Sequence, residues 1–433
     1  FVPASGVASR MFADWQSALI SGGFSSHEKK KFLDEIKKYP FYSHLQQIQN
    51  SDGANIEALI TQGRDVELLK LILTPKGLDY LNMPKAMIVF HRYAKSARSA
   101  LEEHLAEATH YAKDDNGICR LHFTVSEEHL DTVRSFLDKI MPRCEQVFNA
   151  KFLVNISTQS LSTDTITVDE NGEPTRDADG KLIFRAGGHG ALLENLQRIS
   201  EPIIFIKNID NITHESRIAT TIKYKKALAG YLIKLRNVSR DYQAVLAGNP
   251  SDEKITEIKT FCERMLNHRF DEEFIQANKN KRAKILFSAL NRPLRVCGVV
   301  KNEGEPGGAP LWIKGINGRE NVQIVESFQV NHENEEQESI WRKAEFFNPV
   351  DIVCSIRDAQ GNAFNLNEFA NQKAISVTIK RDGTRMIKVL ELPGLWNGAM
   401  AYWNTAFVEV PIATFNPVKT IDDLLRDAHQ QIV

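Results

Sequence analysis

The stretch that decides the fold reads Pro202-Ile203-Ile204-Phe205-Ile206-Lys207-Asn208-Ile209-Asp210-Asn211. Its apolar part is as long as a strand and lacks polar alternation, which is typical of a buried strand in a parallel sheet. Polar residues follow at once, and ligands of α/β folds bind at the carboxyl ends of such strands. The carboxylate of Asp210 is therefore expected to hold a divalent cation. The alternative is a polar strand end without a ligand, because Asp and Asn also favour turns.

Strand-like and helix-like segments alternate on either side of this stretch. Residues 118–125 and 151–156 have strand patterns, and Ser99 and Ser126 have the character of helix N-caps. Helical periodicity covers about 13–77 and 214–290, which we interpret as insertions, and the part from 291 to 433 is rich in strands. The strands expected there are 294–301, 322–330, 374–380, 386–392 and 407–412. The sequence thus predicts one α/β domain over residues 1–433, with a Rossmann-like mixed sheet flanked by helices.

The charge balance limits the possible partners. Among 433 residues, 54 are Lys or Arg and 55 are Asp or Glu, which leaves a formal net charge of −1. This balance provides no field that would hold a nucleic acid backbone or an anionic membrane. No apolar run approaches the roughly 18 residues of a spanning helix. We therefore expect no nucleic acid and no membrane as partner, and the sequence indicates no particular protein partner.

The cysteine pattern indicates the cellular compartment of the protein. Their odd number and wide spacing, without a C-x-x-C pair, argue against a complete disulfide framework and fit a reducing cytoplasm. Because the chain begins at Phe1, we also expect its natural N-terminus to lie upstream. The five cysteines are Cys119, Cys144, Cys262, Cys297 and Cys354.

Several classes of enzyme are excluded by missing motifs. The small-residue loop Ala4-Ser5-Gly6-Val7-Ala8-Ser9-Arg10 is neither a P-loop nor the dinucleotide fingerprint G-x-G-x-x-G. The run Gly187-Gly188-His189-Gly190 is similar to the oxyanion loop of lipases, but no G-x-S-x-G elbow occurs in the chain. The histidines form no H-E-x-x-H pattern, so we expect no zinc. The missing motifs therefore exclude most kinases, dehydrogenases and esterases.

Taken in chain order, these pieces resemble the sugar-1-phosphate nucleotidyltransferases, especially the UDP-glucose, UDP-N-acetylglucosamine and UDP-sugar pyrophosphorylases. Residues 4–11 resemble the family's phosphate loop L-x-G-G-x-G-T-R-L, with Gly6, Ser9 and Arg10 at the matching Gly, Thr and Arg. Ser5 and Ala8 replace two glycines of that loop. Residues 81–85, which end in Pro84-Lys85, are similar to the family's P-K segment, and residues 415–425 are close to F-x-P-V-K-x-x-x-D-L-L, with Lys419 at the lysine.

Further motifs of that family have counterparts here. Gln159 follows a strand as the family's Gln does, and residues 186–192 resemble its P-x-G-[HN]-G loop. Residues 206–211 resemble its x-x-x-x-D-N strand end, residues 324–327 its V-x-E-[YS]-S strand and residues 403–407 its N-H-x-F strand. Through stretches such as 302–308 and 394–400, nearly the whole chain resembles a bacterial family of unknown function, which names no reaction.

The resemblance implies a reaction and a set of roles. A nucleotidyl group, preferably uridylyl from UTP, would pass from a nucleoside triphosphate to a sugar 1-phosphate, with Mg²⁺ on Asp210 and release of pyrophosphate. Arg10, Lys85 and Lys419 would be the catalytic cations. The nucleotide-binding residues would be Ser5, Gly6, Ser9, Gln159, Gly187, Gly188 and His189, where the Gln159 amide can pair with a uracil edge. Glu326, Asn397 and Asn404 are assigned to sugar hydroxyls, because their side chains accept or donate hydrogen bonds.

Two other classes of function stay open. The first is a catalytically inactive nucleotide-sugar-binding or regulatory protein on the same fold, which the replacements at Ser5 and Ala8 favour. The second is a protein-interaction scaffold that uses the two helical insertions. The scaffold leaves the pattern of Lys85, Asp210 and Lys419 unexplained.

Overall fold

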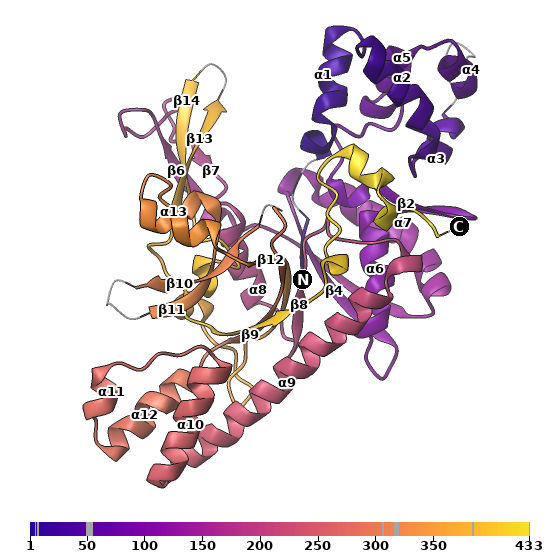
Figure 1. The fold of residues 1–433 in the computed structure, drawn as a ribbon. Coiled ribbons are helices and arrows are strands. Elements are labelled where there is room, and N and C mark those ends of the chain that lie inside the picture. Colours follow the sequence, from indigo (N-terminus) through magenta and orange to yellow (C-terminus); the bar gives the residue numbers. More distant parts are fainter. Residues whose placement is uncertain are drawn as a thin grey trace. The chain divides into compact units, whose positions relative to one another are not determined.

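The computed structural model describes residues 1–4, 6, 8–48, 55–304, 307–315, 320–382 and 385–432. The chain divides into two compact units, and Figure 1 shows its helices and strands. Unit 1 consists of Phe1, Gln159–Lys207 and Tyr224–Ile412, and unit 2 consists of Val2–Thr158, Asn208–Lys223 and Ala413–Val433. Each unit therefore combines segments that are far apart in the sequence.

Unit 2 contains a parallel sheet with the strand order β1-β4-β5. In its register, Val2 lies opposite Phe123 and Ile118 opposite Lys151. The strand predicted over 118–125 is thereby confirmed. Its strands are β1 (Val2–Pro3), β4 (Ile118–Val125) and β5 (Lys151–Thr158), and β2 (Val89–Tyr93) forms a separate antiparallel hairpin with β3 (Ser96–Ser99).

Capped helices accompany this sheet. Ser99 caps α6 as the sequence predicts, since its hydroxyl accepts from the Glu102 amide while the Glu102 carboxylate accepts from the Ser99 amide. The predicted helical stretch 13–77 contains five of the α-helices that the structure describes, and Trp15 packs edge-on against Phe32 and Tyr39 at centroid distances of 5.1 and 5.3 Å. The helices are α1 (Ala13–Ser21), α2 (Ser26–Glu35), α3 (Tyr42–Gln47), α4 (Ile56–Thr61), α5 (Asp65–Leu73), α6 (Ala100–Tyr111) and α7 (Leu130–Phe148).

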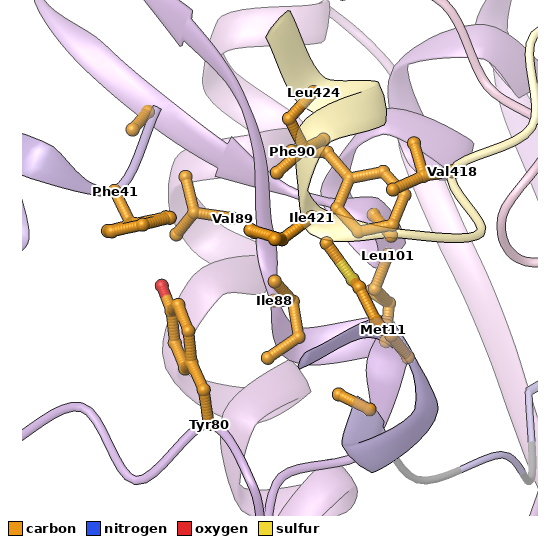
Figure 2. Packing of buried hydrophobic residues seen from close by; sticks show 14 of the residues in the cluster. Met11, Phe41, Tyr80, Ile88, Val89, Phe90, Leu101, Val418, Ile421 and Leu424 are labelled. Carbon is orange, nitrogen blue, oxygen red and sulfur yellow. The ribbon is translucent and has the colours of Figure 1, made fainter. Parts of the chain in front are cut away.

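The C-terminal segment is part of the core of unit 2. Figure 2 shows side chains from separate segments of the unit in one cluster, among them Met11, Phe90, Leu101 and Val418. All four are buried. Burial of each large apolar side chain contributes about 1.5–3 kcal/mol, so this packing fixes residues 418–424 against the β2 and α6 region.

Unit 1 contains a mixed sheet with the strand order β15-β9-β12-β8. β15 (Asn404–Glu409) runs parallel to β9 (Leu294–Lys301), whereas β12 (Phe346–Ser355) is antiparallel to both β9 and β8 (Ile204–Ile206). The predicted α/β class with a mixed sheet is confirmed. The parallel pairing expected for residues 202–206 is corrected by β12, which pairs antiparallel with β8 and was not identified in the sequence.

The remaining strands of unit 1 form two smaller sheets. β10 (Ala309–Lys314) pairs with β11 (Glu320–Val325), and a second sheet has the order β13-β14-β6-β7. Its strands are β13 (Ser376–Asp382), β14 (Arg385–Glu391), β6 (Thr165–Val168) and β7 (Phe184–Arg185). In the chain, Glu326 directly follows β11, and Trp396 lies shortly after β14.

The helices of unit 1 include the predicted helical stretch before β9. The longest, α9 (Ala219–Ala247), begins in unit 2 and continues in unit 1. The others are α8 (Leu193–Gln197), α10 (Asp252–Met265), α11 (Glu272–Gln276), α12 (Lys279–Leu290) and α13 (Glu335–Arg342). Within the described ranges, none of the helices has the length and apolar character that crossing a bilayer requires.

Candidate functional site

Three predicted residues meet in unit 2. The Nζ atoms of Lys85 and Lys419 lie 3.0 and 2.9 Å from the same oxygen, Oδ2 of Asp210. Asp210 follows β8 in the chain, Lys85 follows Pro84 at the start of a short 3₁₀ turn, and Lys419 precedes another such turn at 421–425. The side chains of Lys85 and Asp210 are 13% and 11% exposed, whereas that of Lys419 is 56% exposed. We refer to these three residues as the lysine–aspartate cluster.

Burial and charge act in opposite directions on this cluster. Burial raises the pKa of Asp210, but the two lysines outweigh it, so that its pKa lies below the ordinary value. Burial also lowers the pKa of Lys85, which Asp210 partly offsets. Two ammonium groups share one carboxylate, and the cluster therefore has one positive charge in excess. An anionic ligand would balance it.

Backbone hydrogen bonds fix the segments that carry the cluster. The Lys85 amide donates to the Gly6 carbonyl at 3.1 Å, and the Val418 amide donates to the Asp210 carbonyl at 3.0 Å. The Asn416 amide donates to Oδ1 of Asn211 at 2.9 Å. The predicted phosphate loop thus lies beside the predicted P-K segment, and the predicted P-V-K segment lies beside the D-N strand end.

The structure describes some, but not all, of the other predicted residues of the phosphate loop. Gly6 is exposed, and a Cβ on it would have no atom within 4 Å. Ser9 and Arg10 belong to a 3₁₀ turn over Ala8–Phe12, in which Arg10 is exposed and bonds to no side chain or carbonyl of the described residues. Ser5, the remaining predicted member of this loop, lies outside the described residues.

In unit 1 the glycines of residues 187–190 have packing roles. A Cβ on Gly187 would meet the Thr163 carbonyl oxygen at 2.5 Å, and Gly188 has a φ of +75° beside the Glu391 side chain. The Leu392 amide donates to the Gly187 carbonyl at 2.8 Å. The close approach that these two glycines permit is therefore to neighbouring segments of their own unit.

His189 belongs to an aromatic and carboxylate group in unit 1. Its ring stacks on Trp396 at a centroid distance of 4.4 Å, and its Nδ1 accepts from the Leu395 amide at 3.1 Å, which leaves the ring proton on Nε2. The Trp396 indole donates to Oε1 of Glu326 at 3.2 Å. Burial lowers the pKa of His189, and Glu326 and Glu391 oppose this effect. The ring is therefore held neutral near neutral pH.

The predicted sugar residues differ in their surroundings. Asn397 is 1% exposed, and its Nδ2 donates to the Ile324 carbonyl, so that it lies beside the Glu326 segment. Asn404 instead contacts Nε2 of His268 through Oδ1 at 2.7 Å and the Leu290 carbonyl through Nδ2. Both the oxygen and the nitrogen of its side-chain amide thus have hydrogen-bond partners within unit 1. The Gln159 amide, predicted for a uracil edge, donates to Oδ1 of Asp164 at 3.3 Å.

The sequence predicts magnesium at Asp210. In the part of the chain that the structure describes, no group of three or more His, Cys, Asp or Glu side chains is arranged to hold a metal ion. Mg²⁺, however, usually binds one or two carboxylates together with waters and substrate phosphates. The single carboxylate of Asp210 therefore fits a Mg²⁺ that binds together with phosphates, and it does not fit an all-protein metal cage.

Asp423 is the aspartate of the F-x-P-V-K-x-x-x-D-L-L segment, to which the sequence analysis gave no separate role, and it orients the Lys419 segment. Its Oδ2 accepts from the amides of Lys419 and Thr420, both at 2.7 Å, and its Oδ1 lies 2.7 Å from Arg426. The signal was present, because Thr420 and Asp423 have the spacing of a capping box. Trp396, which the sequence analysis did not assign to the site because a single tryptophan more often packs in a core, stacks on His189 and donates to Glu326.

The chain resembles solved structures at low sequence identity. It is similar to the solved UDP-glucose pyrophosphorylase from Leishmania major in complex with UDP-glucose, with 16% identity and a TM-score of 0.44 over 79% of this chain and 61% of that chain. It is also similar to a UDP-glucose phosphorylase from Trypanosoma brucei, with 17% identity and a TM-score of 0.43 over 80% and 60% of the two chains. The chain thus spans about three fifths of the length of these structures.

No curated protein matches the chain. A family model described as a domain of unknown function, DUF4301, matches residues 1–430. This chain therefore belongs to the DUF4301 family, as its resemblance to a family of unknown function predicts.

Proposed function

We propose that this protein is a sugar-1-phosphate nucleotidyltransferase, which transfers a nucleotidyl group, preferably uridylyl, from a nucleoside triphosphate to a sugar 1-phosphate. The observation that carries the proposal is the convergence of Lys85 and Lys419 on one oxygen of Asp210. A phosphate is itself a nucleophile, so the protein has to align two polyanions and neutralise their charge. A cluster with excess positive charge next to a loop with exposed backbone is suited to that task.

The transfer requires no nucleophile from the protein, because the sugar phosphate itself attacks. An oxygen of the sugar phosphate attacks the α-phosphorus, the bond from that phosphorus to the bridging oxygen of the β-phosphate breaks, and pyrophosphate leaves with the electron pair. Lys85 and Lys419 would exchange Asp210 for phosphate oxygens, which have the same charge and hydrogen-bonding character. Gly6 and Arg10 would hold the β- and γ-phosphates. The stabilisation by these positively charged side chains increases as negative charge accumulates on the phosphate oxygens in the transition state.

Asp210 is proposed to hold Mg²⁺ together with the phosphates once the lysines have released its Oδ2. The ion would supply further neutralisation of charge on the phosphate oxygens. The ion pairs with the lysines keep the buried carboxylate compensated in the free protein, because an unpaired buried charge is costly.

The residues of unit 1 and the remaining loop residues keep the roles that the sequence predicts for them. Gln159, Gly187, Gly188 and His189 are proposed for the nucleotide, and Glu326, Asn397 and Asn404 for the sugar. The neutral His189 can donate one hydrogen bond from Nε2. Ser5 and Ser9 stay predictions for the triphosphate, and each role is to be tested by a variant of its own.

The test has two stages. Thermal unfolding is measured with UTP, other nucleoside triphosphates and UDP-sugars, each with and without Mg²⁺, because a ligand at about 100 times its Kd stabilises by about 2.7 kcal/mol. The nucleotide that shifts Tm is then used with sugar 1-phosphates in a pyrophosphate-release assay. Metal-dependent binding followed by pyrophosphate release is expected. A protein that none of these nucleotides stabilises would end the proposal.

The matched variants are Lys419→Ala and Lys76→Ala. Lys419 belongs to the cluster, whereas the exposed Lys76 lies elsewhere in unit 2. We expect Lys419→Ala to abolish turnover while nucleotide binding persists, since the charge acts chiefly in the transition state. Lys76→Ala should retain both. Unchanged kcat in Lys419→Ala would show that the role given to Lys419 is wrong.

A binding protein without catalysis is the second candidate, and one observation favours it. The Ala8 amide, at the position of a family glycine, donates to the Met83 carbonyl at 3.2 Å. This amide is therefore used within unit 2 and is not oriented toward a phosphate. Stabilisation by a nucleotide or UDP-sugar without pyrophosphate release would identify this second function.

A further inference from the structure

One face of α9 is polar where the helix packs inward. Arg236, Ser239, Arg240 and Gln243 have the spacing i, i+3, i+4, i+7, which places them on the same side of a helix. Ser239 and Gln243 are only 6% and 7% exposed, so this side is turned to the interior of unit 1. An inward face normally carries apolar residues, and its polar character therefore requires partners.

These four residues line a small cavity. Its volume is about 20 Å³, and its other walls include Arg292, which follows α12, Ser355 at the end of β12, and Arg357 and Asp358 just after that strand. A space of this size holds about one water-sized particle. The described residues around it include four guanidinium groups and one carboxylate, that of Asp358.

Hydrogen-bond donors outnumber hydrogen-bond acceptors around the cavity. The hydroxyls of Ser239 and Ser355 and the Nε atoms of Arg236 and Arg240 are buried and have no hydrogen-bond partner among the described residues. Ser355 is 2% exposed. The carboxylate of Asp358 accepts from amide groups of its own turn, at residues 360 and 362. The carboxylate of Asp358 therefore already accepts hydrogen bonds within its own turn.

The arginines are bonded to carbonyl groups. Arg236 donates to the Pro202 carbonyl and Arg240 to that of Asp358, at 3.3 and 3.4 Å. Arg357 donates to three carbonyls. Across the chain segments that the structure describes, none of these three forms an ion pair with a carboxylate. Like charges four residues apart on a helix destabilise it, and burial followed by the charge of Arg240 lowers the pKa of Arg236.

We propose that this cavity is a binding site for one small inorganic anion of the size of chloride, held by Arg236, Arg240 and Arg357 and by the hydroxyls of Ser239 and Ser355. Guanidinium and hydroxyl groups donate hydrogen bonds and have the charge that an anion needs. A monatomic halide needs about the space of one water molecule, whereas phosphate has five heavy atoms. The bound anion connects α9 with the segment after β12 and thereby stabilises unit 1. This site is independent of the lysine–aspartate cluster, which belongs to unit 2.

The test compares thermal unfolding of the full chain in sodium chloride and in sodium methanesulfonate at equal ionic strength. Chloride at about fivefold excess over Kd should raise the Tm of the step in which unit 1 unfolds by roughly 2–4 °C. Sodium bromide should give a similar shift and an anomalous X-ray peak within the cavity. Equal Tm values in chloride and methanesulfonate, or a water molecule as the sole occupant in bromide crystals, would overturn the proposal. A shift with phosphate but not with chloride would overturn the assignment to a halide.

Variants separate this site from general effects of salt. The double variant Arg236→Gln, Arg240→Gln should fold, because it removes two like charges, and it should lose the chloride shift. Ser239→Ala should reduce the shift without changing charge. Arg264→Gln, which changes an exposed arginine on α10, is the control and should keep the full shift. A chloride shift that persists in the double variant would place the anion elsewhere.

Discussion

At the scale of single residues, Asp210 connects the proposed chemistry with stability. Its pKa is lowered because Lys85 and Lys419 outweigh the effect of burial. A carboxylate with a lowered folded pKa adds stability above its ordinary value of 3.8, and this stability is lost as the pH falls through the folded value. The cluster is therefore expected to contribute to stability at neutral pH and to lose that contribution in acid.

The first prediction follows for Asp210→Asn. The variant should be less stable than the wild type at neutral pH, because two ammonium groups remain together without their carboxylate. Its stability should also depend less on pH around and below 3.8. Urea unfolding across this pH range measures both effects, with Asp252→Asn, an exposed first-turn residue of α10, as the control. Parallel pH profiles for Asp210→Asn and the wild type would contradict the assigned interaction.

Gly6 provides a second test at this scale. A Cβ at this position would have open space around it, and its φ is not among the positive values. Gly6→Ala should therefore fold with nearly unchanged stability, yet its methyl group would stand where phosphates are proposed to approach. We expect weaker nucleotide binding, measured as a smaller Tm shift at a fixed UTP concentration. Gly230→Ala, at an exposed position of α9, should bind as the wild type does.

At the scale of elements, the strands that the sequence predicted well are regular and buried. β4 and β9 begin and end at the predicted residues, because their side chains form continuous or alternating apolar runs. The predicted strand over 322–330 is instead β11 up to Val325 and a 3₁₀ turn from Ser327, since the Gln329 side chain accepts from the Glu326 amide and closes the turn. Boundaries set by such side-chain bonds are not visible in periodicity.

The strand that sequence reasoning missed is β12, which lies between β8 and β9. It contains Asn348, Pro349 and Asp351, and a proline within a run argues against a central strand. The structure tolerates these residues through an irregular register between Phe347 and Asp351, where Val350 has a φ of +59°. Asn348 donates to the Gly298 carbonyl at 2.7 Å and replaces a missing ladder bond. Only the tertiary pairing makes this segment a strand.

The third prediction concerns the buried ion pair between Lys225 on α9 and Asp351 on β12. Their side chains are 2% and 5% exposed, so neither charge has water as an alternative partner. Lys225→Met should destabilise the protein by about 3–5 kcal/mol, because it leaves a buried carboxylate unpaired. The double variant Lys225→Met, Asp351→Leu should recover most of this loss. Urea unfolding of both variants checks the prediction, and a double variant no more stable than the single one would refute it.

The candidate site was predictable where it rests on local motifs. Lys85, Asp210 and Lys419 each stand in a short recognisable pattern, and the structure places the Nζ atoms of the two lysines 3.0 and 2.9 Å from Oδ2 of Asp210. Asn404 also stands in such a pattern, but its contacts with His268 and Leu290 depend on helices that have no family motif. The arginines of α9 have no motif either. Their significance depends on what the helix packs against, which a single sequence does not contain.

At the scale of the whole molecule, the two units have separate hydrophobic cores. The core of unit 2 includes Phe12, Phe90 and Leu424, and that of unit 1 includes Leu196, Ile352 and Met400. The five cysteines are divided between the units, with Cys119 and Cys144 in unit 2 and the other three in unit 1. All five are buried and unpaired in disulfides. Chains with separate cores commonly unfold in more than one step.

These thiols give the last prediction, which concerns unfolding of the entire chain. Burial raises the pKa of Cys119, Cys144 and Cys297 to about 11 and that of Cys262 and Cys354 to about 12, so thiolates are scarce in the native protein at pH 8, below the ordinary value of 9.0. A disulfide reagent should therefore label the native chain very slowly. Over a urea gradient, we expect two steps of labelling, one with the two thiols of unit 2 and one with the three thiols of unit 1. Mass spectrometry of the labelled peptides assigns each step. If chloride binds in unit 1, it should move only the step that contains Cys262, Cys297 and Cys354 to higher urea, whereas a single step for all five thiols would show that the two cores unfold together.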